Sequence, residues 1–374
     1  MIIAPHLGGS TLRIRLSNRY GSTPLVLGRV TVGVRGQGAS LVTGSERRLT
    51  FAGRASVTIP AGAEAVSDPV GLRFGAFQDL AVSVYVPGSV PHPTDHFTTR
   101  QTSYLSPRDS GDHAAEEGGS AFSQKTTGRY STGWYFLDGV DVLAPGSTGA
   151  VVAFGDSITD GYQGKAGSGG EQLATVDTNG RYPDDLARRL VAAKIPLSVL
   201  NAGVSGNQVL HSGLLLFGPS GLSRFGVDAL AQPGVTDVIV LEGVNDIAST
   251  SRATAPQLIA AYEQLITAAH RAGVAIELGT LTPTGGVASA AYGSASAVAV
   301  REQVNRWIRT QRFSDGIVDF DAAVRDRLDP SEINPAYNGG DYVHFNLAGY
   351  RALARAVDLR LLARPDCLAG AHRP

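Results

Sequence analysis

Cysteine is almost absent from this sequence of 374 residues, and Cys367 is its only example. A single thiol excludes an internal disulfide and a cysteine-rich metal site, and its position after Pro365, near the C-terminus, argues against a catalytic thiol. Lysine is nearly as scarce, because it occurs only at Lys125, Lys165 and Lys194. With a formal net charge of -1 and no basic block, the sequence gives no indication of nucleic-acid binding.

Long apolar runs are missing as well. No stretch approaches the roughly 18 residues that a membrane span needs. Residues 1–5 are too short and too uncharged for a signal peptide. Hydrophobic residues nevertheless make up 43% of the chain and charged residues 17%, which suits ordinary cores and argues against a disordered protein. The length exceeds that of one average domain, so we expect two or three.

The first part of the chain, residues 1–142, has the pattern of short strands. Leu12, Ile14 and Leu16 alternate with polar or charged neighbours, and valines repeat this period of two farther along. Turn-forming residues separate the runs, and no segment carries a helical stripe. Strands at this spacing predict an all-β domain, an antiparallel sandwich or jelly roll.

The pattern changes after residues 143–149, a stretch centred on Pro145-Gly146-Ser147 that we interpret as a linker. In residues 150–374 short apolar strands alternate with long amphipathic helices. Strands are expected at residues 151–154, 197–200, 237–241, 274–278 and 317–320, and helices from near Pro256, around residues 300–308, and from Leu347 to Leu361. This alternation predicts an α/β domain with a doubly wound parallel sheet and helices on both faces.

Polar side chains follow the predicted strands of this sheet. Asp156, Ser157 and Asp160 come after the first strand, residues 201–207 after the second and residues 242–246 after the third. Residues 341–344, which include an acid and a histidine, follow the fifth strand after a short helix. Ligands of parallel α/β sheets gather at the carboxyl ends of the strands. These residues supply a nucleophile, a base, an acid to orient the base, and oxyanion donors. The sequence therefore favours acyl transfer.

The sequence motifs of several other enzyme classes are absent or incomplete. There is no Gly-x-Ser-x-Gly, so the α/β-hydrolase elbow is absent. Gln172 stands where a dinucleotide fingerprint needs its last glycine, and Thr159 and Ala166 replace essential P-loop residues. His92 and His96 have the outer spacing of a zinc motif without its glutamate. We expect neither a metal nor an organic cofactor.

Four blocks of the sequence resemble those of the SGNH (GDSL) hydrolases in order and approximate spacing. They are Gly155-Asp156-Ser157, Gly206-Asn207, Gly243-Val244-Asn245-Asp246 and Asp341-x-x-His344, within residues 149–363. The resemblance implies a flavodoxin-like domain and a serine esterase in which Ser157 is the nucleophile. It also implies that His344 is the general base and that Asp341 orients it. The oxyanion hole would comprise the backbone N–H groups of Ser157 and Gly206 and the side-chain amide of Asn245.

The first half of the chain is similar to the β-sandwich that precedes such a domain in some actinobacterial secreted esterases and two-domain carbohydrate esterases. Residue 1 falls close to the first predicted strand, as though an upstream segment were missing. This favours export, with a cytoplasmic enzyme as the alternative. Whether the sandwich binds glycan or only shapes the cleft is left open, as is the oligomeric state.

The expected substrate is a short-chain acyl ester, a small molecule or an acetylated carbohydrate. The segment between residues 161 and 182 is rich in glycine and polar residues, is expected to border the site, and lacks the long apolar lid expected for lipids. Residues 214–217, Leu-Leu-Leu-Phe, are a candidate acyl wall. The alternatives are a lipase or lysophospholipase of the same fold, or a glycan-binding protein whose hydrolase domain is silent.

Overall fold

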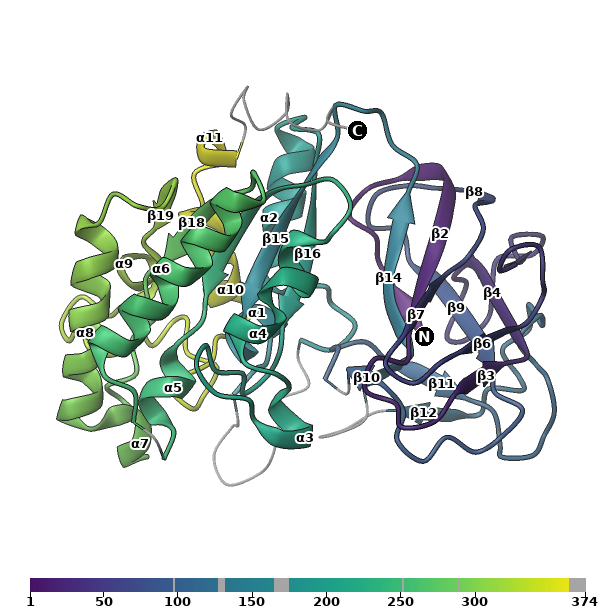
Figure 1. Cartoon of the computed structure of the whole chain (residues 1–374), viewed down its shortest axis with the longest axis horizontal. Coiled ribbons are helices and arrows are strands. Elements are labelled where there is room, and N and C mark those ends of the chain that lie inside the picture. Colours follow the sequence, from purple (N-terminus) through teal and green to yellow (C-terminus); the bar gives the residue numbers. More distant parts are fainter. Residues whose placement is uncertain (97, 127–131, 165–174, 251, 288, 363–374) are drawn as a thin grey trace. The chain divides into compact units, whose positions relative to one another are not determined.

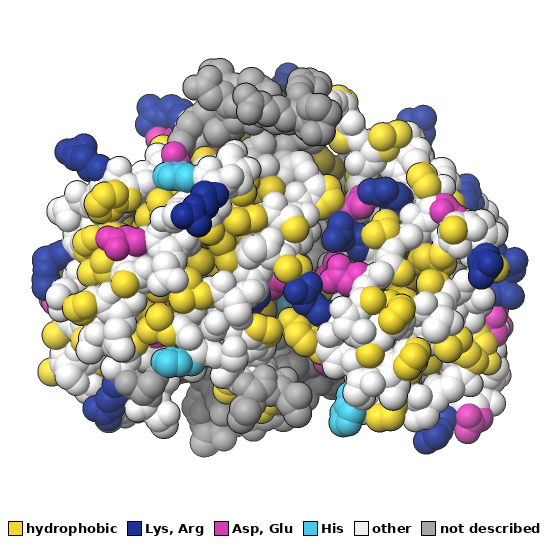
Figure 2. All heavy atoms as spheres, in the orientation of Figure 1, with side chains coloured by type: hydrophobic (Ala, Val, Ile, Leu, Met, Phe, Trp, Pro, Cys, Tyr) yellow, Lys and Arg dark blue, Asp and Glu magenta, His cyan; other side chains and the backbone are white. Residues whose placement is uncertain are grey.

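A computed structural model describes the chain apart from residues 97, 127–131, 165–174, 251, 288 and 363–374. The chain divides into two compact units, Met1–Ala144 and Pro145–Pro374 (Figure 1). Within the described residues, no helix is both long enough and apolar enough to cross a membrane. On the face drawn in Figure 2, side chains of both charge signs are scattered among hydrophobic ones, which agrees with the balanced net charge.

The first unit is built from antiparallel strands. One sheet has the order β1-β9-β4-β5, and a second has the order β14-β2-β7, in which β8 also pairs with β2. Three two-stranded ribbons, β3–β6, β10–β13 and β11–β12, complete it. The strands are β1 (Ile2–Ile3), β2 (Gly9–Ser17), β3 (Leu25–Leu27), β4 (Arg29–Val34), β5 (Arg47–Arg48), β6 (Val57–Ile59), β7 (Glu64–Val66), β8 (Val70–Phe74), β9 (Leu80–Tyr85), β10 (Asp95–His96), β11 (Ser103–Leu105), β12 (Gln124–Thr126), β13 (Trp134–Tyr135) and β14 (Leu137–Val142).

One apolar core joins the two larger sheets of this unit. Leu12, Ile14 and Leu16 of β2 are buried in the same cluster as Val30 of β4 and Val82 of β9. The predicted alternation along β2 is therefore confirmed, and the two sheets pack as a sandwich. Burying each of these side chains contributes about 1.5–3 kcal/mol relative to exposure. The part of this unit that the structure describes contains no helix, as the sequence predicted.

The second unit contains a five-stranded parallel sheet in the order β16-β15-β17-β18-β19. This is the strand order of flavodoxin-like folds, so the doubly wound prediction is confirmed. Gly155, the last residue of β15, pairs with Gly203 of β16 and with Leu241 of β17, so three strands end at one level. The strands are β15 (Gly149–Gly155), β16 (Leu197–Gly203), β17 (Val235–Leu241), β18 (Ala275–Gly279) and β19 (Gly316–Val318).

Helices cover both faces of this sheet. The connection from β15 to β16 runs one way across the sheet and the later connections run the other way. Right-handed crossovers place these connections on opposite faces. Helix α2 contacts α10, and α6 contacts α8 and β18. The helices are α1 (Ser157–Asp160), α2 (Tyr182–Ala192), α3 (Leu214–Phe217), α4 (Gly221–Phe225), the π-helical turn η1 (Gly226–Leu230), α5 (Val244–Ala248), α6 (Ala255–Arg271), α7 (Ala290–Gly293), α8 (Ala295–Thr310), α9 (Phe320–Val324), α10 (Leu347–Ala356) and α11 (Leu359–Leu362).

The bounds of all five predicted strands differ from the observed ones by up to three residues, and two boundaries in this unit have a visible cause. The fifth strand ends at Val318 rather than at residue 320, because Asp319 caps α9 by accepting a hydrogen bond from the Ala322 N–H at 3.1 Å. The last predicted helix is two helices. Val357 adopts an extended conformation after α10, and the side chain of Asp358 accepts a hydrogen bond from the Arg360 N–H at 3.0 Å as α11 begins.

Candidate active site

Ser157 lies at the first position of helix α1, directly after strand β15. Asp156 caps this helix by accepting a hydrogen bond from the Ile158 N–H at 2.9 Å. Gly155 has no room for a side chain, since an added Cβ would come within 2.3 Å of the Leu241 carbonyl oxygen. This tight turn presents Ser157 at the carboxyl end of the sheet, beside the position where the strand order reverses.

A continuous chain of hydrogen bonds joins three of the predicted site residues. Ser157 Oγ lies 2.7 Å from His344 Nε2. On the other side of the imidazole ring, His344 Nδ1 lies 2.7 Å from Asp341 Oδ2. Both contacts have the short length of well-formed hydrogen bonds. Asp341 and His344 lie 184 and 187 positions after Ser157 in the sequence, so only the tertiary fold brings the three together.

The protonation state of Asp341 determines the tautomer of the histidine. Burial alone would raise the pKa of Asp341, but hydrogen bonds from the His344 ring and from two backbone N–H groups outweigh it and lower the pKa to about 2. Those N–H groups belong to Val343 and His344, at 3.0 and 2.8 Å from Asp341 Oδ1. An ionised Asp341 accepts a hydrogen bond from the Nδ1–H group, which leaves Nε2 as the acceptor for the hydroxyl of Ser157.

The turn that carries the acid and the histidine has an unusual backbone. Tyr342, between them, has a positive φ of 62°. Asn338 holds this turn, because its side-chain oxygen accepts hydrogen bonds from the N–H groups of Gly340 (2.8 Å) and Tyr342 (3.1 Å). A left-handed conformation at a bulky residue costs about 1–3 kcal/mol, a strain that is typical of functional sites.

Two neighbours pack against the histidine and the acid. The ring of Tyr162 lies edge-on to His344, with 4.6 Å between ring centroids, and the Tyr350 hydroxyl donates a hydrogen bond to the Tyr162 carbonyl. Gly164 lies against Asp341, where an added Cβ would come within 2.4 Å of Asp341 Cγ. These contacts limit the movement of His344 and Asp341.

Two backbone N–H groups near the nucleophile are free to donate. Among the described residues, the N–H groups of Ser157 and Gly206 find no acceptor. Gly206 has a positive φ of 79°, and an added Cβ there would come within 2.2 Å of the Phe217 ring. Both the backbone conformation and the contact therefore require glycine at this position.

The side-chain amide of Asn245, on helix α5, contacts the neighbours of both groups. Asn245 Nδ2 donates to the Asn207 carbonyl at 2.9 Å and lies 3.4 Å from Asp156 Oδ2. Its Oδ1 accepts a hydrogen bond from the Tyr292 hydroxyl at 2.8 Å. All five predicted site residues thus lie at one edge of the sheet.

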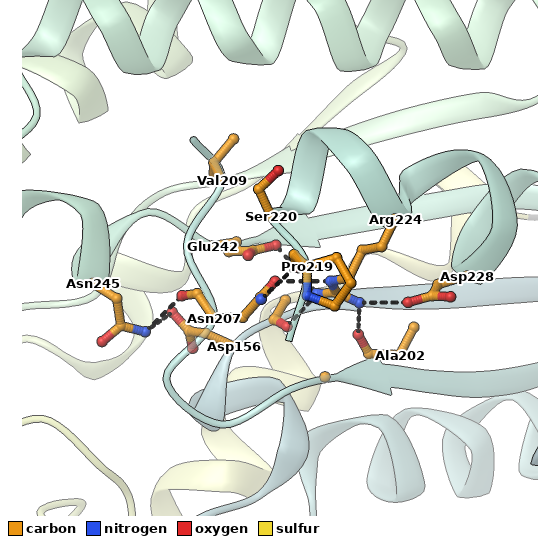
Figure 3. A network of polar contacts seen from close by, with 12 residues as sticks. Asp156, Ala202, Asn207, Val209, Pro219, Ser220, Arg224, Asp228, Glu242 and Asn245 are labelled. Carbon is orange, nitrogen blue, oxygen red and sulfur yellow. Dashed lines mark hydrogen bonds and ion pairs between the residues drawn. The ribbon is translucent and has the colours of Figure 1, made fainter. Parts of the chain in front are cut away.

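A buried arginine makes several hydrogen bonds to residues at this edge (Figure 3). Arg224, on α4, donates from Nε to Asn207 Oδ1 at 2.8 Å and from its terminal nitrogens to the carbonyls of Ala202 (2.7 Å) and Gly155 (2.8 Å). It also lies 3.4 Å from Glu242 Oε2, and both side chains are almost completely buried. One guanidinium group therefore connects the ends of three strands.

Three buried carboxyl groups surround this network. Burial raises the pKa of Asp156 to about 7 and that of Glu242 to about 8, in spite of an N–H donor at Asp156 and of Arg224 at Glu242. Burial likewise raises the pKa of Asp246 to about 6, although it accepts hydrogen bonds from the N–H groups of Val209 and Leu210. Such raised pKa values cluster at functional sites.

Sequence reasoning missed Arg224, Tyr292 and Tyr162. Each comes from a short helix or loop without periodicity, and no motif identifies them. Of the segment between residues 161 and 182, which was expected to border the site, residues 165–174 lie outside the described residues, as does Cys367, whereas Tyr162 and Gly164 lie against His344 and Asp341. In the expected acyl wall, Leu216 and Phe217 are exposed by 59% and 43%.

Comparison with known proteins places this site in a family. The model of the GDSL-like Lipase/Acylhydrolase family matches residues 153–352, which include all five site residues. No curated protein matches the sequence significantly. Similar solved structures include an aryl esterase of M. smegmatis, with 17% identity over 56% of this chain and 96% of that chain and a TM-score of 0.45. Another is a carbohydrate acetylesterase family member from Sinorhizobium meliloti, with 20% identity over 56% and 95% of the two chains and a TM-score of 0.45. Similarities of this strength carry no argument about substrate. The chain belongs to the GDSL-like lipase/acylhydrolase family and is a carboxylic ester hydrolase.

Proposed function

We propose that this enzyme hydrolyses short-chain acyl esters, acetyl esters of carbohydrates among them, through Ser157, His344 and Asp341. The observation that supports this most directly is the hydrogen-bond chain from Ser157 Oγ through the His344 ring to Asp341, with both contacts at 2.7 Å. A serine is a weak nucleophile unless a positioned base removes its proton. In this hydrogen-bond chain His344 is the base, and the ionised Asp341 holds its ring in position.

The proposed reaction has two steps. His344 Nε2 takes the proton of Ser157 as Oγ attacks the ester carbonyl, and the resulting imidazolium, stabilised by Asp341, then donates that proton to the leaving alcohol. An acyl-enzyme remains on Ser157. Water, deprotonated by the same nitrogen, attacks the acyl-enzyme, and the proton returns to Ser157 as the carboxylic acid leaves.

The oxyanion of each tetrahedral intermediate would lie among three donors. The free N–H groups of Ser157 and Gly206 are two of them. Asn245 Nδ2 is the third, since one of its N–H groups has only the 3.4 Å contact with Asp156, a weak hydrogen bond that the oxyanion can replace. Fixed donors of this kind stabilise developing charge without reorganisation, and losing one lowers kcat by about 10²–10³.

The contact of Phe217 with Gly206 supports a short acyl group. The ring of Phe217 occupies the space directly beside the proposed oxyanion glycine, so an acyl chain entering on that side meets an aromatic wall at once. The neighbouring Leu216 is also exposed. This apolar surface suits the methyl or ethyl group of a small acyl chain.

The test is a series of p-nitrophenyl esters from acetate to palmitate, together with a Ser157→Ala variant. We expect the highest kcat/KM at acetate or butyrate, and a loss of turnover of about 10⁴-fold or more in Ser157→Ala. Ser296→Ala removes an exposed hydroxyl from α8 and should retain full activity. A fluorophosphonate should add its mass to the wild type and to Ser296→Ala, but not to Ser157→Ala.

Each other outcome has a definite meaning. Retained turnover in a folded Ser157→Ala protein would remove Ser157 as the nucleophile. Preference for palmitate would favour the lipase alternative over the short-chain proposal. Absence of turnover in the wild type, across the ester series and a panel of acetylated glycans, would favour a silent hydrolase domain.

A further inference from the structure

The amide of Asn245 is held at both ends. Its nitrogen faces two acceptors, the Asn207 carbonyl and the Asp156 carboxyl group, and Figure 3 shows the amide oxygen turned away from them. That oxygen accepts a hydrogen bond from the hydroxyl of Tyr292 at 2.8 Å. A flipped amide would set its oxygen against the Asn207 carbonyl, so two acceptors would face each other.

Tyr292 is itself fixed by its surroundings. It belongs to the short helix α7, whose N-cap Ser289 accepts a hydrogen bond from the Ala291 N–H. The Thr284 hydroxyl donates to the Tyr292 carbonyl at 3.1 Å. Gly293 allows the turn to close, since an added Cβ would come within 2.3 Å of the Val287 carbonyl oxygen. Helices α7 and α5 are in contact, so Tyr292 and Asn245 are carried by packed elements.

We infer that Tyr292 is a positioning residue of the oxyanion hole, because its hydroxyl holds the Asn245 amide with Nδ2 directed toward the oxyanion. The inference rests on the proposed function, in which Asn245 is an oxyanion donor. Without Tyr292 the amide would be held at its nitrogen alone and could pivot about the hydrogen bond to the Asn207 carbonyl, whereas a partner at its oxygen fixes the orientation. A hydrogen bond to the amide oxygen also polarises the group and strengthens its N–H donors.

Tyr292 can act as a donor throughout the pH range of an esterase assay. Burial, together with the nearby charges of Asp156 and Asp341, raises the pKa of Tyr292 to about 12. The hydroxyl therefore keeps its proton at neutral and mildly alkaline pH. Asn245 Oδ1 accepts the hydrogen bond from this hydroxyl, and in this arrangement the nitrogen of the amide faces its two acceptors.

The test is Tyr292→Phe, which removes only the hydroxyl. We expect kcat for p-nitrophenyl acetate to fall about three- to tenfold, with KM within about twofold of the wild type. The inhibition constant of a short alkyl boronic acid, whose serine adduct is tetrahedral and anionic, should weaken by the same factor. These readouts respond to stabilisation of the intermediate rather than to ground-state binding.

A double-mutant cycle distinguishes a specific effect of Tyr292 on Asn245 from a general destabilisation of the active site. In an Asn245→Ala background, Tyr292→Phe should have no further effect on kcat, because the group that it positions is gone. Tyr262→Phe is the matched control. Its hydroxyl donates to the Glu242 carbonyl at 2.7 Å, so whatever it does to kcat should be the same in both backgrounds.

The outcomes distinguish the inference from the function on which it rests. A Tyr292→Phe variant with wild-type kcat, with a change in KM alone, or with an effect that persists in Asn245→Ala would overturn the positioning role and leave the oxyanion hole intact. If Asn245→Ala itself keeps the wild-type kcat, the proposed oxyanion hole fails and the role of Tyr292 fails with it.

Discussion

The carboxyl group of Asp341 lies directly against the backbone of Gly164, where an added Cβ would come within 2.4 Å of Asp341 Cγ. The added Cβ would lie almost equally close to Cγ, Oδ1 and Oδ2, at 2.4, 2.5 and 2.6 Å, so Gly164 covers one face of the carboxyl group. Two backbone N–H groups and the His344 ring hold its oxygens. Contact with Gly164 keeps the carboxyl group from moving out of this arrangement.

Gly164→Ala should displace Asp341 and disturb the orientation of His344. A catalytic group misplaced by about 1 Å lowers the rate about 10²-fold, so we expect kcat for p-nitrophenyl acetate to fall about 10- to 100-fold. Gly226→Ala is the matched control, since nothing lies within 4 Å of its added Cβ, and it should retain activity. Equal activities of the two variants would show that the contact does not restrain the acid.

The parts of this site that the sequence predicted are those that follow readable strands. Ser157, Gly206 and Asn245 each come after a short apolar run, and parallel strands end at a common edge. The alternation of strands and helices thus required only local patterns, whereas the choice of Gly206 and Asn245 as oxyanion donors came from the resemblance to the SGNH hydrolases. The sequence predicted one helix from Leu347 to Leu361 because apolar residues recur at helical spacing across Val357. The structure has two helices there, and the second begins after Asp358, whose side chain accepts a hydrogen bond from the Arg360 N–H.

The supporting residues could not be predicted in this way. Arg224 acts through carbonyl groups of two strands and the side chain of Asn207, and these contacts depend on how α4 packs. Tyr292 reaches Asn245 only because a loop after β18 returns to the same edge. No sequence motif links Arg224 or Tyr292 to the residues that it contacts, so only the tertiary structure identifies these two residues.

Arg224→Met should destabilise the second unit. The substitution removes donors from two strand carbonyls and, at pH 9, above the pKa of Glu242, leaves the ionised carboxylate without its cation; breaking a buried pair in this way costs about 3–5 kcal/mol. The free energy of unfolding in urea measures this. The double variant Arg224→Met/Glu242→Gln should recover part of the loss. Arg271→Met, at an exposed position at the end of α6, should change stability by no more than about 0.5 kcal/mol.

Stability should depend on pH through Glu242. Burial, which Arg224 offsets only in part, raises the pKa of Glu242 from 4.5 to about 8. The folded protein holds this proton more tightly than the unfolded chain does. The free energy of unfolding should therefore fall as pH rises from about 4.5 to about 8, by at most about 1.4 kcal/mol per pH unit from this group.

Glu242→Gln should make that decline less steep, since Asp156 and Asp246 still contribute to it. Urea midpoints at pH 5, 6, 7 and 8 measure the slope. Glu263→Gln changes an exposed carboxyl group on α6 and should leave the slope unaltered. If Glu242→Gln keeps the wild-type slope, Glu242 is ionised over this range and its pKa is not raised.

Phe217→Ala should extend the range of acyl groups that the enzyme accepts. The ring of Phe217 lies directly beside Gly206. We expect its removal to make room for two or three more methylene groups of the acyl chain. At about 0.8 kcal/mol for each buried methylene, the ratio of kcat/KM for hexanoate to that for acetate should rise about tenfold or more. Phe313→Ala, which removes a ring that is 60% exposed, serves as the control for the loss of a surface aromatic side chain. An unchanged ratio in Phe217→Ala would mean that the acyl group lies on another side of Gly206, and that chain length is limited elsewhere.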